Sequence, residues 1–267
     1  MKNLKYVGLT MLSALLLMAC GGGNPTASFE GVEFDSIVID TIAKLGKAED
    51  APQCKLRLSI QYAKGENAQK FNDTLLRSGI LAPDYFSLSN EKLSVKAILD
   101  SFACKYVSDY LRDYGTLYRA DTEHAASYNC EFIVNTSTHN GGNHVLNYVA
   151  SIYSFGGGEH GIQQTIVKNF DMKTYRLLTL NDMFIDAKHI VLKEQMIEKL
   201  AKKLDVENLE ELQQKYIFAD GQVYLPDNFI LEDDKITFIY CEDEIAPHEI
   251  GEIRVEFDKD DLKSYLR

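Results

Sequence analysis

Positive charge is scarce in this sequence. Lys and Arg number 28 against 40 Asp and Glu, which gives a formal net charge of −12 at pH 7. A protein that binds nucleic acid needs basic residues to neutralise phosphates, so this balance argues against a nucleic-acid partner. Hydrophobic residues make up 45% of the chain and charged residues 25%. This ordinary globular mixture excludes a wholly disordered or fibrous protein.

The motifs of several common enzyme classes are also missing. The sequence has no GxSxG, HExxH or Walker A pattern and no EF-hand loop. Its glycine run Gly156–Gly158 joins two predicted strands, whereas a phosphate loop leads into a helix N-terminus, so we expect the run to shape a turn. Carboxylates are plentiful, but no spacing marks out a pair for acid–base chemistry. We therefore expect no enzyme activity and no cofactor.

Metal-binding patterns are weak. No two cysteines form a CxxC pair, which gives little support to a zinc or thioredoxin-like site. His139 and His144 flank a predicted hairpin turn and could in principle join His160 as metal ligands. Because no patterned carboxylate or cysteine accompanies them, the sequence predicts no metal site, and we expect His160 to be bonded to backbone in its loop.

The first twenty residues resemble the leader of a bacterial lipoprotein. Lys2 and Lys5 precede an apolar run over residues 9–18, which is too short for a membrane span and is typical of a secretory signal. Leu17-Met18-Ala19-Cys20 resembles a lipobox, in which the Cys thiol carries the lipid and the chain is cut before it. The resemblance implies a signal peptide over residues 1–19 and a lipid on Cys20.

This resemblance also implies a cellular location. Residues 20–28 are small or turn-forming and lack an apolar pattern, so they are expected to form a flexible tether between the lipidated cysteine and the folded body. Gly21 stands where enteric bacteria use Asp to retain a lipoprotein in the inner membrane. We therefore expect an exported protein, anchored to the membrane through the lipid at Cys20, in the outer membrane of the cell envelope.

Four further cysteines follow Cys20, namely Cys54, Cys104, Cys130 and Cys241. An exported protein meets an oxidising compartment, so disulfides are allowed. Four cysteines permit three pairings, and the sequence does not choose between them. Buried free thiols and one structural disulfide are both open.

Hydrophobic periodicity predicts the elements of the remaining chain. Strands are expected over residues 54–62, 128–138, 144–155, 161–171, 228–232, 235–241 and 252–257. Helices are expected over residues 66–80, 92–118, 188–203 and 206–218, with a short one at the end. Grouped helices and hairpins predict an α+β fold, with antiparallel sheets and helices packed on one face. We expect an N-terminal α+β part over residues 29–140 and a C-terminal α+β part over residues 141–267.

Four short motifs in the second half resemble an exported domain family. Tyr153 to His160 resembles a stretch in which Tyr is followed by G-G-x-H, and Asn169 to Thr174 is similar to the pattern N-F-D-x-K-T. Leu178 to Phe184 is similar to L-T-L-x-D-L-F, and Glu244 to Ile253 is similar to E-I-A-P-x-x-x-G-x-I. The family forms the extracellular part of RsiV-type anti-sigma factors, which sense lysozyme, and a segment of PdaC-type peptidoglycan deacetylases. The resemblance implies a non-catalytic α+β envelope domain, without the deacetylase or sigma-binding parts.

Two loops are the candidate binding surface. The acidic segment Glu242-Asp243-Glu244 precedes apolar residues in a predicted turn, and acidic charge around an apolar tip suits a basic protein partner. The expected ligand-binding residues are Tyr153, Gly157, Glu159, His160, Glu242, Asp243, Glu244, Pro247 and His248. The expected ligand is a protein such as lysozyme, or peptidoglycan. The alternatives are a cell-wall hydrolase centred on His160 or a carboxylate, and a structural scaffold of the envelope.

Overall fold

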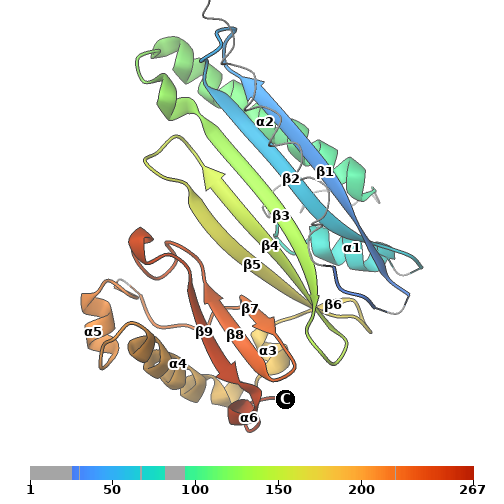
Figure 1. Cartoon of the computed structure of the whole chain (residues 1–267), viewed down its shortest axis with the longest axis vertical. Helices are drawn as coiled ribbons and strands as arrows, with labels where there is room; N and C mark the ends of the chain where they lie inside the picture. The colour runs from blue at the N-terminus through green and yellow to red at the C-terminus, as the bar shows by residue number, and fades with distance from the viewer. Residues whose placement is uncertain (1–25, 30, 67, 82–93, 220) are drawn as a thin grey trace, which may run out of the picture.

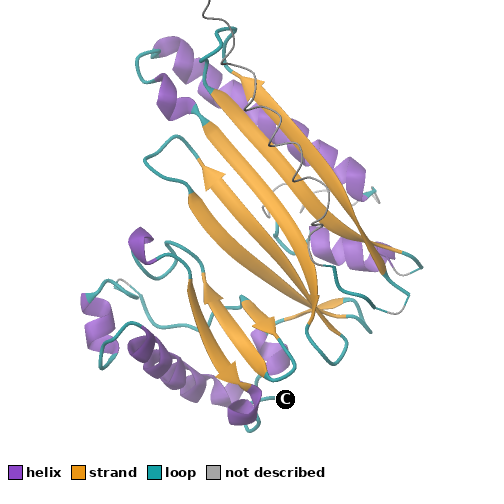
Figure 2. Cartoon of the chain, in the orientation of Figure 1, coloured by secondary structure: helices purple, strands orange, loops and turns teal. Residues whose placement is uncertain are grey.

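The computed structural model describes residues 26–29, 31–66, 68–81, 94–219 and 221–267. The predicted signal peptide and Cys20 lie outside these residues. The described chain forms a six-stranded sheet and a three-stranded sheet with helices packed against them (Figures 1 and 2). This arrangement confirms the α+β fold. None of the described helices is long and apolar enough to cross a membrane.

The six-stranded sheet has the order β1-β2-β3-β4-β5-β6. Its strands are β1 (Glu33–Lys44), β2 (Gln53–Lys64), β3 (Cys130–Asn140), β4 (Val145–Phe155), β5 (Ile162–Asp171) and β6 (Arg176–Leu178). Neighbouring strands are antiparallel except β2 and β3, which are parallel. A parallel pair needs a long crossover, and α1 (Ala68–Leu76) and α2 (Val95–Ala120) lie within it. The sheet is therefore mixed, whereas the sequence predicted antiparallel pairing throughout.

Strand β1 was not predicted from the sequence. This strand pairs with β2 over its whole length and forms an edge of the sheet. Its outward residues include Val38 and Ile42, which are 60% and 57% exposed. An edge strand that leaves apolar residues in water has no clean alternation between apolar and polar positions. The period-two pattern of β2, whose residues Leu56 and Leu58 are fully buried, made the neighbouring strand much easier to predict.

The first hydrophobic core lies between this sheet and the two crossover helices. It joins Phe71 of α1 and Phe102 of α2 to the inward residues of β2, β3, β4 and β5. The rings of Phe71 and Phe170 have centroids 4.6 Å apart. Tyr148 is fully buried and its hydroxyl donates to the Gln61 carbonyl at 2.7 Å, so the polar end of the ring is satisfied.

A second core lies under the three-stranded sheet, whose order is β7-β8-β9. The elements of this part are α3 (Leu180–Met183), α4 (His189–Lys203), α5 (Leu209–Gln214), β7 (Phe229–Leu231), β8 (Lys235–Tyr240), β9 (Ile253–Asp258) and α6 (Lys259–Leu262). Helix α4 lies along this sheet (Figure 1), and Leu192, Met196 and Leu200 are fully buried in the core. The two cores divide near residue 180, whereas the boundary expected after residue 140 falls in the hairpin between β3 and β4.

The end of the predicted tether is docked on the first sheet. The Ala27 N–H donates to Thr138 Oγ1 at 2.9 Å, and Gln61 Nε2 donates to Thr26 Oγ1 at 3.0 Å. Thr26 and Ala27 are therefore hydrogen-bonded to the six-stranded sheet. The chain enters the body beside the β3–β4 turn.

Buried asparagine side chains join the two sheets. Asn147 on β4 is 1% exposed, and its amide pairs with both backbone groups of Leu231 on β7. Asn147 Nδ2 donates to the Leu231 carbonyl at 2.6 Å, and the Leu231 N–H donates to Asn147 Oδ1 at 3.0 Å. One strand further along the first sheet, Asn169 Nδ2 donates to the Phe229 carbonyl at 2.8 Å. These amides take the place of a neighbouring strand for β7.

A third asparagine makes the reverse connection. Asn228 precedes β7, and its Oδ1 accepts from the Val167 N–H at 2.8 Å while its Nδ2 donates to the Thr165 carbonyl at 2.8 Å. We call Asn147, Asn169 and Asn228 the asparagine clamp. The clamp satisfies backbone groups that would otherwise be buried without partners where the sheets meet. It fixes β7, and through it the three-stranded sheet, against β4 and β5.

Two of the four cysteines that follow Cys20, namely Cys54 and Cys130, lie side by side. All four are thiols in the structure, and Cys54 on β2 is the direct partner of Cys130 on the parallel strand β3. The contact lowers the pKa of Cys54, whose sulfur accepts a hydrogen bond from Cys130, and raises the pKa of Cys130. Paired strands are about 4.8 Å apart, within the Cα separation that a disulfide spans. Cys104 is exposed on α2.

Replacing Asn147 by Ala should lower the free energy of unfolding by about 3 kcal/mol, because it leaves two buried backbone groups of Leu231 unpaired. Urea unfolding at pH 7 measures the change. Asn135→Ala is the matched control, since Asn135 lies exposed on β3 and its loss should cost under about 0.5 kcal/mol. Equal stability of the two variants would contradict the role of the clamp.

Oxidised glutathione should convert Cys54 and Cys130 into one intramolecular disulfide, each thiol losing a proton and an electron to the added disulfide. Intact mass and peptide mapping measure the product. Cys104→Ser should leave this bond unchanged, and Cys54→Ser should abolish it. A bond that joins any other two cysteines in the folded protein would contradict the register of β2 and β3.

Candidate functional site

The two predicted binding loops meet at one end of the molecule. The first connects β4 to β5, and the second runs from Cys241, at the end of β8, to Gly251 before β9. The imidazole rings of His160 and His248 are stacked, with centroids 3.7 Å apart and an interplanar angle of 30°. Residues far apart in the sequence therefore form one surface across the junction of the two sheets.

Two carboxylates converge on the same nitrogen of this histidine pair. Glu242 Oε1 lies 2.9 Å from His248 Nδ1, and Asp243 Oδ2 lies 3.3 Å from it. The other oxygen of Glu242 accepts from the Gln163 N–H on β5 at 2.6 Å. His160, Asp243 and His248 each offer one ligand atom, and these atoms all lie within 4.8 Å of one another. The site therefore holds nitrogen and oxygen donors from both loops.

Local backbone geometry explains the glycines of the first loop. Gly157 has φ +84°, and a Cβ there would lie 1.8 Å from the Ser127 carbonyl oxygen. A Cβ on Gly161 would overlap the ring of Tyr153, whose side chain is half-buried on β4. Positive φ and this close approach require glycine at position 157. The run thus shapes the turn that carries Glu159 and His160, which are exposed.

The second loop is also held in a defined shape. Asp243 has φ 62°, a left-handed conformation that Asp tolerates better than most residues. Pro247 precedes a single 3₁₀ turn over His248–Ile250, and Gly251 ends it with φ 69°. These two features define the backbone on either side of His248.

Glu244 also stabilises the second loop, as Glu242 does by accepting from the Gln163 N–H. The Glu244 carboxylate accepts from the Tyr224 hydroxyl and from the Cys241 N–H. Burial, together with this carboxylate, raises the pKa of Cys241 to about 12 and raises the pKa of Tyr224 as well. Glu244 is therefore a positioning residue, whereas Glu159 and Asp243 face solvent.

The histidine grouping considered from the sequence does not form. His139 and His144 flank the turn at the start of β4, whereas His160 follows the end of that strand. Eleven strand residues place the two ends more than about 30 Å apart. The partner of His160 is His248, which the sequence analysis had assigned to a binding loop but not to a metal set. Only the packing of the two sheets reveals this pair.

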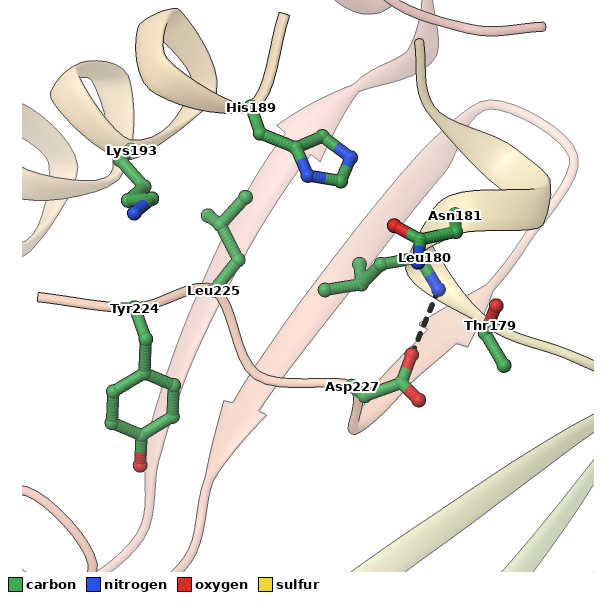
Figure 3. A pocket seen from close by; sticks show the side chains of 8 residues that line it. All are labelled: Thr179, Leu180, Asn181, His189, Lys193, Tyr224, Leu225 and Asp227. Carbon is green, nitrogen blue, oxygen red and sulfur yellow. Dashed lines mark hydrogen bonds between the residues drawn. The ribbon is translucent and has the colours of Figure 1, made fainter. Parts of the chain in front are cut away.

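A separate pocket of about 300 Å³ lies within the part of the chain that contains the three-stranded sheet (Figure 3). Its lining combines residues from α3, α4 and the segment before β7, namely Thr179, Leu180, Asn181, His189, Lys193, Tyr224, Leu225 and Asp227. Asp227 accepts from the Leu180 N–H at 2.8 Å. His189 Nε2 is buried without a hydrogen-bond partner. The sequence analysis did not identify this pocket, because no motif connects its contributing segments.

Residues 181–260 match the family described as a protein of unknown function, DUF3298. The match contains the pocket's α4 and the loop of Glu242 to His248, but not the loop of His160. This part of the chain is similar to DUF3298 domains. A comparison with curated proteins finds no significant match.

Two solved structures extend the similarity to nearly the whole chain. A DUF3298 family member from Bacteroides fragilis has a TM-score of 0.76 at 24% identity, covering 92% of this chain and 96% of that chain. A DUF3298 family protein from Pseudomonas aeruginosa has a TM-score of 0.59 at 16% identity, covering 89% and 95%. At these identities the likeness shows the fold. The finer resemblance to RsiV-type and PdaC-type proteins stays a prediction.

Gly157→Ala should displace the first loop, because the new methyl group would overlap the Ser127 carbonyl at a left-handed residue. We expect a loss of about 2 kcal/mol in unfolding free energy and a changed chemical shift of the His160 ring protons. Gly158→Ala is the matched control, since a Cβ there meets open space. An unperturbed His160 signal in Gly157→Ala would contradict this geometry.

Proposed function

We propose that this protein is an exported, lipid-anchored binding module of the cell envelope, without catalytic activity, and that its two-loop surface binds a basic protein such as a lysozyme. The observation that carries the proposal is the stacking of His160 on His248, which joins two loops into one surface. Acidic side chains surround the pair, and the whole chain has a net charge of −12.

The charge of this surface suits a basic partner. Glu159 and Glu249 are exposed on either side of the histidine pair in sequence, and Asp243 lies beside His248. Complementary charge steers a partner toward a site and raises the rate of association. Lysozymes are commonly basic proteins, which is the property that this surface would recognise.

The position of the first described residues indicates on which side of the molecule a lipid anchor would lie. Ala27 is bonded to Thr138, near the β3–β4 turn, whereas His160 follows the opposite end of β4. A lipid on Cys20 would therefore attach at the end of the six-stranded sheet remote from the two-loop surface. This arrangement would present the surface away from the bilayer, toward a partner that approaches the cell.

The pocket of Figure 3 favours a second, smaller ligand. It places the cation of Lys193 and the unpaired Nε2 of His189 beside the polar side chains of Thr179 and Asn181. A fragment of peptidoglycan carries the hydroxyl, amide and carboxylate groups that such a lining would bind. Peptidoglycan is therefore the alternative ligand.

Calorimetric titration of the purified chain in detergent with a basic lysozyme tests the proposal. Saturable binding should weaken as salt rises, because exposed charges are screened. Glu159→Gln combined with Glu249→Gln should weaken binding about tenfold at low salt and flatten the salt dependence. Neither side chain has a structural contact that its replacement would break.

The matched control carries the same change of charge elsewhere. Glu194→Gln combined with Glu198→Gln alters two exposed residues of α4, and it should leave the affinity within about twofold. No binding at either salt, or equal losses in both double variants, would overturn the assignment of this surface. Binding of soluble peptidoglycan fragments that His189→Ala abolishes would favour the pocket instead.

A further inference from the structure

We infer that His160, Asp243 and His248 form a binding site for a divalent transition-metal ion of the Zn²⁺ class. Two imidazoles and one carboxylate are a donor set that Zn²⁺ and its neighbours bind well, whereas Mg²⁺ and Ca²⁺ prefer oxygen ligands alone. The inference does not rest on the proposed partner, because it concerns the ion that these side chains hold without any other protein.

The distances between donor atoms fit such an ion. Two ligand atoms about 2.0–2.1 Å from a tetrahedral zinc ion lie about 3.3 Å apart. His248 Nδ1 and Asp243 Oδ2 are 3.3 Å apart. One ring nitrogen of His160 lies within 4.8 Å of one ligand atom of Asp243 and one of His248, so a rotation of its exposed side chain would complete the set.

The crowding around one nitrogen gives a second reason. Two carboxylates approach His248 Nδ1, from Glu242 at 2.9 Å and from Asp243 at 3.3 Å, but a ring nitrogen carries at most one hydrogen. A cation in the place of that hydrogen would interact favourably with both oxygens. The backbone N–H of Gln163 already fixes the second oxygen of Glu242, which is how outer groups commonly orient a metal site.

A metal ion at this site would link the two sheets, because its ligands come from a loop of each sheet. His160 follows β4 of the six-stranded sheet, whereas Asp243 and His248 follow β8 of the three-stranded sheet. A bound ion would link the loop after β4 to the loop after β8. Three protein ligands would also leave a coordination position for water, for Glu242 or for a group from a partner.

Zinc titration of the purified chain in detergent, in a Cys104→Ser background that removes the exposed thiol, tests this inference. One Zn²⁺ per chain should bind with a dissociation constant in the micromolar range or tighter. The midpoint of thermal unfolding should rise by roughly 5 °C at saturating zinc, since an ion that binds only the folded chain stabilises it. Mg²⁺ at the same concentration should produce neither effect.

Three variants locate the ion. His160→Ala, His248→Ala and Asp243→Asn should each weaken zinc binding at least about tenfold. His124→Ala is the matched control, because exposed His124 also has a carboxylate partner, Asp121 at 2.8 Å, but no second imidazole. Zinc should also shift the ring-proton signals of His160 and His248 and leave those of His124 unchanged. Absence of binding, or binding that survives loss of both site histidines, would overturn the inference.

Discussion

Three asparagine side chains, two of them buried and Asn228 partly buried, hold the two sheets of this protein together, and the candidate site depends on them. Asn147 and Asn169 supply the hydrogen bonds that β7 would otherwise draw from a neighbouring strand. In the opposite direction, Asn228 accepts a hydrogen bond from the Val167 N–H on β5. A side-chain amide carries one acceptor and two donor hydrogens, so it can pair with the backbone of a strand that crosses the sheet at an angle. An apolar contact could bury the same area, but it would leave the orientation of β7 free.

The fixed orientation of β7 brings the two binding loops together. His160, in the loop after β4, and His248, in the loop after β8, are 88 positions apart in the sequence, yet their rings are in contact. Gly157 shapes the first loop by a close approach to Ser127, and Glu244 holds the second by accepting from Tyr224. The residues that face solvent can bind, whereas the residues beside them keep the loops in place. A binding function and a metal site are both compatible with this division of roles.

Much of the fold could be predicted from the sequence, because local patterns decide it. The alternation of β2, the periodicity of α2 and the glycine turn between β3 and β4 each act within a few residues. The edge strand β1 was missed because its outward face carries exposed Val38 and Ile42. The parallel pairing of β2 and β3 was also missed, since it follows from a crossover of 65 residues rather than from a turn.

The site was partly predictable for the same reason. Glycine and acidic residues marked the two loops, and the structure brings the loops together. The pairing of His160 with His248, the positioning role of Glu244 and the asparagine clamp could not be predicted. The histidine pair and the clamp depend on contacts between the two sheets, and Glu244 depends on Tyr224, 20 residues earlier in the chain, so no local spacing encodes them. A polar residue inside a strand, such as Asn147, indicates an unusual partner without naming it.

The contact between the two histidine rings is the most direct test of this account. A nuclear Overhauser experiment on the uniformly isotope-labelled chain would measure it in solution. Ring centroids 3.7 Å apart predict strong cross-peaks between the carbon-bound ring protons of His160 and His248. Their absence in a folded sample, with cross-peaks of the clamp between Asn147 and Leu231 still present, would show that the two loops do not form one surface.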